Sequence, residues 1–135
     1  HPNVVVILAG TNDIAGNTGP ISVEGIEENM ASISELARAH NIAVVWSSVT
    51  PVNNYTPRSL DFFATRPPAK ILELNRWLTQ YCADNHLVYL DYFPAMVDKD
   101  GLLRRDLAED GLHPNAAGYA IMAPMAETAI QKALQ

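Results

Sequence analysis

Two short polar clusters contain the residues whose types and spacing could do chemistry. The first, residues 10–13, includes Asn12 and follows a run of large apolar residues. Polar side chains at the end of a buried strand cannot belong to the core, so each needs a partner or a task. The second cluster, residues 110–115, includes Asp110 and His113, which lie three positions apart across a glycine. Thr11, Asn12, Asp13, Asp110 and His113 are therefore candidates for a functional role.

The spacing of Asp110 and His113 lets the carboxylate accept a hydrogen bond from one imidazole nitrogen while the other nitrogen faces a pocket. A carboxylate in that place fixes the tautomer of the ring and stabilises the imidazolium, as the base of a nucleophilic hydrolase requires. The alternative is a turn at Asp110-Gly111 with His113 capping a loop, and these residues alone leave both interpretations open.

The element that must position Asn12 is the run Val4–Leu8. Five large apolar residues in succession, three of them valine, predict a strand buried on both faces, as in the middle of parallel sheets. The β-branched residues, Pro2 before the run and Gly10 after it disfavour a helix. Asn12 then lies at the carboxyl end of the strand, which is the edge of open α/β sheets where ligands bind.

Apolar periodicity predicts the remaining elements. We expect a helix from Ser22 to about 41, a strand over 43–46, a helix starting at 67–68, a strand over 87–90 and a last helix from 116 to about 134, capped by Asn115. Strands that alternate with helices make right-handed parallel crossovers. The fold class is α/β, a flavodoxin-like three-layer α/β/α sandwich with a parallel sheet.

For some residues within these elements we expect a specific environment. Asn75 lies on the buried side of its helix, so we expect its amide to bond to nearby backbone. Pro124 should kink the last helix or lie on its solvent face. The aperiodic segment 51–66 leaves the same sheet edge as Asn12 and is expected to contact substrate. The apolar positions of the first helix, at helical spacing, are Val23, Ile26, Met30, Ile33 and Ala37.

The place of the Val4–Leu8 strand in the chain raises a difficulty. With three strands in sequence order, it would form a bare, flat, hydrophobic edge, which soluble proteins avoid. We expect an upstream segment, a second chain or a swapped neighbour to cover it. The chain opens at His1-Pro2, almost directly on this strand, so we expect its true start to lie upstream and the N-terminal strands of the sheet to be missing.

Composition limits the class of protein. The chain is 48% hydrophobic and 18% charged, an ordinary globular balance. A net charge of -6 without a Lys/Arg run disfavours nucleic-acid or anionic-membrane partners, and no apolar run has the length of a membrane span. The single cysteine excludes an internal disulfide, and the scattered histidines indicate no metal site. The compartment stays unknown, with a secreted or periplasmic protein possible, because a signal peptide would lie upstream.

The two clusters in order resemble the SGNH hydrolase superfamily, also called GDSL lipases and acylhydrolases. Gly10-Thr11-Asn12-Asp13 at a strand end and Asp110-x-x-His113-Pro114 before the last helix carry the resemblance, which extends from Pro2 onward. It implies that Asn12 donates its side-chain NH2 to a tetrahedral oxyanion, an interaction worth roughly 3–4 kcal/mol in analogous sites. It also implies that His113 is the general base, that Asp110 is its carboxylate partner, and that no cofactor or metal is needed.

The chain departs from the family pattern at the nucleophile. The family's serine lies in a Gly-Asp-Ser motif after the first strand, and a later glycine gives a second oxyanion donor, but neither motif is present. The serines available are Ser22, Ser32, Ser34, Ser47, Ser48 and Ser59. In the family the strand that carries the nucleophile pairs with the one that Val4–Leu8 matches. We therefore expect residues 1–135 to be a single partial SGNH hydrolase domain that is inactive alone.

The predicted function is that of a serine esterase or acylhydrolase, acting on a small-molecule ester such as an acyl ester or an acetylated sugar. One alternative is a non-catalytic carbohydrate- or acyl-binding module of the same fold. A nucleotide-binding flavodoxin-like domain is disfavoured, because Gly10, Gly16 and Gly19 do not fit Gly-x-Gly-x-x-Gly. A structural fragment that dimerises through the exposed strand edge is the third alternative.

Overall fold

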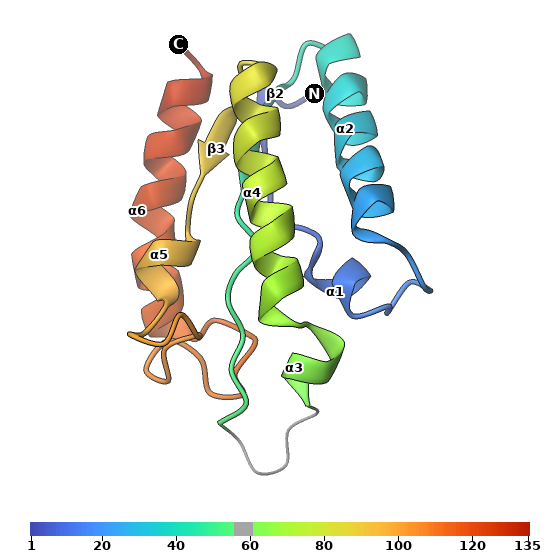
Figure 1. Cartoon of the computed structure of the whole chain (residues 1–135). Coiled ribbons are helices and arrows are strands. Elements are labelled where there is room, and N and C mark those ends of the chain that lie inside the picture. Colours follow the sequence, from blue (N-terminus) through green and yellow to red (C-terminus); the bar gives the residue numbers. More distant parts are fainter. Residues whose placement is uncertain (56–60) are drawn as a thin grey trace.

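The computed structural model describes residues 1–55 and 61–135, which form one three-stranded sheet with helices on both faces (Figure 1). All strands are parallel, in the order β1-β2-β3. The α/β sandwich with a parallel sheet is therefore confirmed. The elements are β1 (Val4–Ile7), α1 (Thr11–Ile14), α2 (Val23–Ala39), β2 (Ala43–Ser47), α3 (Phe62–Thr65), α4 (Pro68–Asp84), β3 (Val88–Leu90), α5 (Phe93–Met96) and α6 (Ala116–Ala133).

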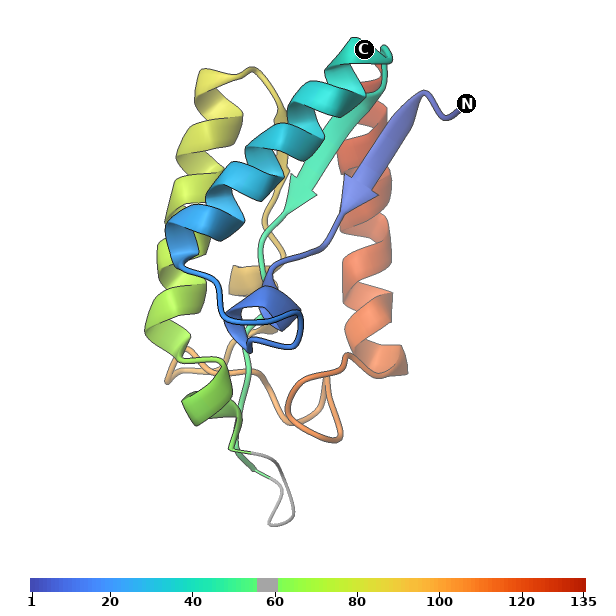
Figure 2. The ribbon, with the colours of Figure 1, turned by 90° about the vertical axis from the view of Figure 1, so that its right-hand side faces the viewer.

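The sheet is the middle of three layers. Helices α2 and α4 cover one face and α6 covers the other, as Figure 2 shows. The side chains of β1 alternate between the two layers. Val5 and Ile7 pack with the cluster that includes α2 and α4, whereas Val4 and Val6 pack with the cluster that includes α6. This period of two follows from the pleat of a β-strand.

The predicted helix ends are confirmed. Ser22 Oγ accepts a hydrogen bond from the backbone N–H of Gly25, and Asn115 Oδ1 accepts one from Gly118. Each cap satisfies a donor that has no partner within its helix. Proline begins α4, and Pro124 lies on the exposed side of α6, as expected.

One apolar position of α2 does not face the core. Ile33 is 43% exposed, and the neighbouring Ser34 is buried in its place. The Ser34 hydroxyl donates to the carbonyl of Met30 and accepts a hydrogen bond from the indole N–H of Trp46 at 2.8 Å. A buried indole N–H needs an acceptor, so the polar side chain faces the core.

Three short helices do not follow from apolar periodicity, namely α1, α3 and α5. Four residues are too few to display a helical repeat. Helix α1 contains the first polar cluster, and α3 lies within the segment 51–66 that was expected to have no regular structure. Residues 56–60 of that segment lie outside the described part of the chain, so the expected substrate contact is not tested there.

Both faces of strand β1 pack against helix layers, but the strand is not fully buried as predicted, because it lies at the edge of the sheet. Its four residues are half-buried, and Leu8 directly after it is 47% exposed. An apolar hollow runs beside it, lined by Pro2, Val5, Ile33, Leu36, Ala37, His40 and Ile42. Within residues 1–55 and 61–135, no helix has both the length and the apolar character needed to cross a membrane.

Candidate functional site

Asn12 is positioned by the turn between β1 and α1. Gly10 has φ +104°, a left-handed conformation that glycine adopts without strain. A Cβ atom at this position would also lie 2.9 Å from Leu74 Cδ2, so the packing leaves no room for a larger residue. The carbonyl of Gly10 accepts the N–H of Ile14, which closes the single turn of α1. Asn12 is thereby held, exposed, at the carboxyl end of β1 (Figure 1).

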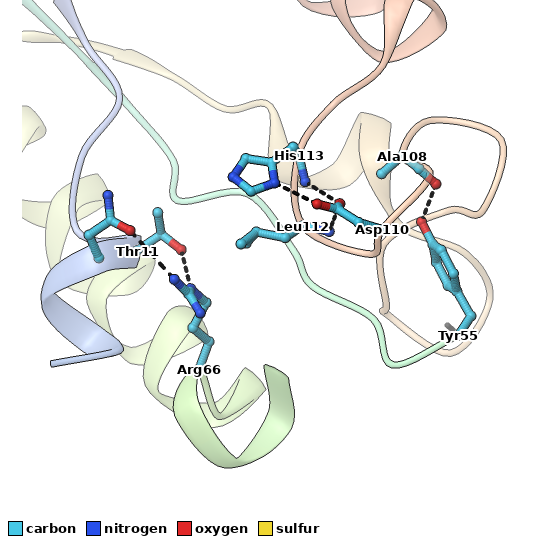
Figure 3. Close-up of polar contacts among 8 residues, drawn as sticks. Thr11, Tyr55, Arg66, Ala108, Asp110, Leu112 and His113 are labelled. Atoms are coloured by element: carbon cyan, nitrogen blue, oxygen red, sulfur yellow. Dashed lines mark hydrogen bonds and ion pairs between the residues drawn. The ribbon is translucent and has the colours of Figure 1, made fainter. Parts of the chain in front are cut away.

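Two donors fix the direction of the Asn12 amide. Its Oδ1 accepts a hydrogen bond from Asn17 Nδ2 at 3.0 Å and one from Arg66 Nη2 at 3.4 Å. Arg66 Nε also donates to Thr11 Oγ1 at 3.2 Å, as drawn in Figure 3. Because the oxygen faces these donors, Nδ2 is on the other side of the amide. It forms no hydrogen bond with any residue that the structure describes.

The structure brings Asp110 and His113 together. His113 Nδ1 lies 2.6 Å from Asp110 Oδ2, while Asp110 Oδ1 accepts the backbone N–H groups of Leu112 and His113 at 2.8 Å each (Figure 3). The His113 side chain is 77% exposed. Its Nε2 has no hydrogen-bond partner among residues 1–55 and 61–135 and can therefore act on an incoming group.

The hydrogen bonds around Asp110 keep it ionised. Partial burial raises the pKa of its carboxyl, but the His113 ring and the N–H groups of His113 and Leu112 outweigh burial and lower the pKa from 3.8 to about 2. Hydrogen bonds to a charged form favour that form. At neutral pH the carboxylate is thus an acceptor, which fixes the proton of a neutral His113 on Nδ1 and leaves Nε2 as the basic nitrogen.

Close packing fixes the loop that carries this pair. Gly111 has φ +90°, and a Cβ atom on it would come within 2.0 Å of the carbonyl oxygen of Asn53. The carbonyl of Gly111 in turn accepts the N–H of Asn53 at 2.9 Å. On the other side, Phe62 lies 3.7 Å from the same Cβ position, and its ring is stacked below the Arg66 guanidinium at 5.7 Å. Phe62 therefore links the loop of His113 to the residues around Asn12.

Both polar clusters lie at the carboxyl end of the parallel strands, the same end of the molecule in Figures 1 and 2. In Figure 3 the His113 ring lies on the side of Asp110 that faces Thr11 and Arg66. A shallow pocket is lined by Glu109, Asp110, His113, Pro114 and Asn115. A larger hollow opens at the opposite end of the sheet, beside Asn41 and His86, far from these clusters. The candidate site is therefore identified by its side chains, Asp110 and His113, and not by the volume of the pocket.

Each serine in the described part of the chain forms a hydrogen bond with the backbone. Ser22 caps α2, Ser32 and Ser34 donate to carbonyls of their own helix, Ser47 donates to the carbonyl of Ile7, and Ser48 accepts the N–H of Phe93. Ser59 lies outside the described residues. The structure also shows no group of three or more His, Cys, Asp or Glu side chains, within the residues it describes, that could hold a metal ion.

Sequence reasoning included Arg66 only as part of the segment 51–66 that was expected to contact substrate, and did not predict its contacts with Asn12. The side chain is 6% exposed, and 54 residues separate it from Asn12. Its position in a segment rich in aromatic and polar residues was the available signal. Tyr55, from the same segment, donates its hydroxyl to the carbonyl of Ala108 and carries the Arg105 guanidinium 4.7 Å above its ring.

Comparisons with known proteins identify the family of the chain. The model of the GDSL-like lipase/acylhydrolase family matches residues 1–121. Two of the solved structures that are similar to this chain come from species of Bacteroides. One is of a protein named as an acylhydrolase from Bacteroides fragilis, with 34% identity and a TM-score of 0.90 over 99% of this chain and 64% of that one. The other is of a GDSL-like lipase from Bacteroides thetaiotaomicron, with 37% identity and a TM-score of 0.87 over 98% of this chain and 64% of that one.

A curated relative extends the similarity to a much longer protein. The N-acylneuraminate cytidylyltransferase of Streptococcus agalactiae is 34% identical over 107 residues, which are 79% of this chain and 23% of the relative. The chain thus spans about a quarter of the length of that relative and less than two thirds of the length of the two solved structures. Because the family model covers most of the chain, the chain belongs to the GDSL-like lipase/acylhydrolase family of the SGNH hydrolase superfamily.

Proposed function

We propose that this chain supplies three groups of a serine esterase site: Asn12 as an oxyanion donor, His113 as the general base and Asp110 as its carboxylate partner. The observation that carries the proposal is the hydrogen-bonded Asp110–His113 pair, whose loop lies at the same end of the sheet as α1, the helix that contains Asn12. Membership of a hydrolase family supports it. The exposed Nε2 of His113 and the unengaged Nδ2 of Asn12 are the two groups that would meet the ester.

The proposed reaction proceeds in two steps through an acyl-enzyme. His113 Nε2 takes the proton of a serine hydroxyl while the serine oxygen bonds to the ester carbonyl carbon. The carbonyl oxygen becomes an oxyanion that accepts a hydrogen bond from Asn12 Nδ2. The C–O bond to the alcohol then breaks, and the leaving oxygen takes the proton from His113. Water repeats the sequence and releases the acid, while Asp110 stays ionised throughout.

We propose that the serine lies outside these 135 residues, on a strand of the same polypeptide that pairs with β1. The serines in the described part of the chain are committed to caps, helix carbonyls or buried contacts. The exposed edge of β1 and the apolar hollow beside Leu36 offer the place for such a strand and for a helix after it. Residues 1–135 are then part of one domain and inactive alone.

The substrate is a small-molecule ester. The name of one relative refers to a sugar, N-acylneuraminate, whose acyl group is an amide. The sugar part of that name supports testing an O-acetylated sugar beside a simple acyl ester. A carbohydrate- or acyl-binding module without turnover is the alternative. It predicts ligand binding without release of acid, and binding that survives the loss of His113.

The test is ester hydrolysis by the polypeptide that carries this chain and its serine, with p-nitrophenyl acetate and an acetylated sugar as substrates. His113→Ala should lower kcat at least about 10³-fold, because the general base is lost. His86→Ala is the matched control, since His86 is an exposed residue at the opposite end of the sheet. Full activity of His113→Ala would contradict the proposed function.

A further inference from the structure

We propose that Arg66 is a positioning residue for the reaction, acting through Asn12 rather than on the substrate. Its guanidinium turns the Asn12 amide so that Nδ2 faces the reacting carbonyl, and it polarises that amide into a stronger donor. The inference rests on the proposed function, since it presumes that Asn12 binds the oxyanion.

Burial and contacts single out this arginine. Arg66 is the one arginine among the buried residues of the described chain, and it donates through three nitrogens: Nε to Thr11 Oγ1, Nη1 to Thr65 Oγ1 and Nη2 to Asn12 Oδ1. Within residues 1–55 and 61–135 no carboxylate pairs with it. A buried charge without a partner of opposite sign is costly, so the position of this guanidinium next to Asn12 indicates a task.

The geometry specifies what that task is. Asn12 Oδ1 accepts from both Asn17 Nδ2 and Arg66 Nη2. If the amide were flipped, its NH2 would face these two donors, so the observed orientation is strongly preferred. A hydrogen bond from a charged donor is stronger than one from a neutral donor, and a chain of such bonds polarises its members. Nδ2–H thus becomes a better donor toward developing negative charge.

Lysine could not replace this arginine fully. The planar guanidinium reaches Thr11 and Asn12 with separate nitrogens, whereas lysine offers a compact ammonium on a flexible stem. The ring of Phe62 below the guanidinium further sets its plane. We therefore expect Arg66→Lys to retain the fold and recover part of the function that Arg66→Met loses.

A double-mutant cycle on the polypeptide that carries this chain and its serine tests the inference. Arg66→Met should lower kcat about 10- to 100-fold, the loss expected for a hydrogen bond from a charged group, with KM changed less than about 3-fold. In an Asn12→Ala background the same substitution should change kcat by less than about 2-fold, because the group through which it acts is gone. Arg76→Met, an exposed arginine on α4, is the control and should have no effect.

The outcomes separate the possible roles. An equal loss from Arg66→Met in both backgrounds would overturn the inference and indicate a structural role. A rise in KM with unchanged kcat would overturn it in favour of direct contact with a substrate anion. If Asn12→Ala by itself left kcat unchanged, the proposed role of Asn12 would fail, and this inference with it.

A second measurement needs no activity. The side-chain amide protons of Asn12, observed by NMR on the polypeptide that carries this chain and its serine, should shift and exchange faster in Arg66→Met than in the parent. The amide of Asn75, which is buried and bonded to Val49, reports that the fold is retained. Unchanged Asn12 amide signals in a folded Arg66→Met variant would contradict the inference, and an intermediate effect of Arg66→Lys would support it.

Discussion

Asp110 binds the His113 ring through one carboxylate oxygen and the backbone N–H of His113 through the other, at 2.6 and 2.8 Å. The same side chain thus shapes the loop and orients the imidazole. Since both oxygens are engaged, the position of the ring is tied to the backbone that carries it. This double attachment fixes the direction of the ring relative to its loop.

Replacing Asp110 with asparagine should lower kcat by about 10⁴-fold in the polypeptide that carries the serine, because the amide no longer fixes the proton of His113 on Nδ1. Asp98→Asn is a matched control. Asp98 Oδ1 also accepts two backbone N–H groups, those of Asp100 and Leu102, but it faces no histidine. Equal losses from the two substitutions would indicate that Asp110 has only a loop-forming role.

The low pKa of Asp110 predicts how the loop responds to acid. The folded pKa is about 2, below the ordinary value of 3.8. Its contribution to stability is therefore fully present above the unfolded pKa and is lost as the pH falls through the folded value. The carboxyl 13C resonance of Asp110 should titrate near pH 2, and the amides of Leu112 and His113 should lose protection over the same range. A midpoint at or above 3.8 would contradict the hydrogen bonding described.

Gly111→Ala should displace the loop of His113 and remove most activity. The added Cβ would meet the carbonyl of Asn53 at 2.0 Å, and the backbone has φ +90°. Gly101→Ala separates these two effects, because Gly101 has φ +76° with open space around it. It should lower the free energy of unfolding by about 1 kcal/mol through backbone strain alone and leave activity unchanged. Urea denaturation and ester hydrolysis measure both quantities. Similar activity in both variants would show that the contact with Asn53 does not hold the loop.

Asn75→Leu should destabilise the chain by about 2–4 kcal/mol, because it leaves two buried backbone groups without partners. Asn75 Oδ1 accepts the N–H of Val49 at 2.7 Å, and its Nδ2 donates to the carbonyl of Val49 at 2.9 Å. Gln80→Ala on the exposed side of the same helix should change the free energy of unfolding by less than about 0.5 kcal/mol. Equal midpoints of the two variants in urea would contradict this account of Asn75.

Local patterns sufficed for the features of the fold that depend on neighbours in sequence. The caps at Ser22 and Asn115, the start of α4 and the role of Asn75 were predicted, because cap chemistry and helical spacing act within a few residues. The burial of Ser34 could not be predicted in this way. It depends on the indole of Trp46, which another element brings to it.

The candidate site was predictable only in part for the same reason. Asp110 and His113 are three residues apart, so their spacing indicates their contact. Arg66 meets Asn12 across 54 residues, and Gly111 meets Asn53 across the packed loops, so no short pattern contains either contact. The position of β1 at the sheet edge followed from strand order, whereas its half-buried state depends on what covers it.

The most direct test of the central claim is labelling with a serine-directed fluorophosphonate, read by intact mass. The 135-residue chain should stay unlabelled. The polypeptide that continues into the proposed strand should take up one label on a serine outside residues 1–135, and His113→Ala should abolish the labelling. A label on a serine of the chain itself, or labelling that survives His113→Ala, would contradict the claim that Asn12, Asp110 and His113 complete a site whose nucleophile comes from elsewhere.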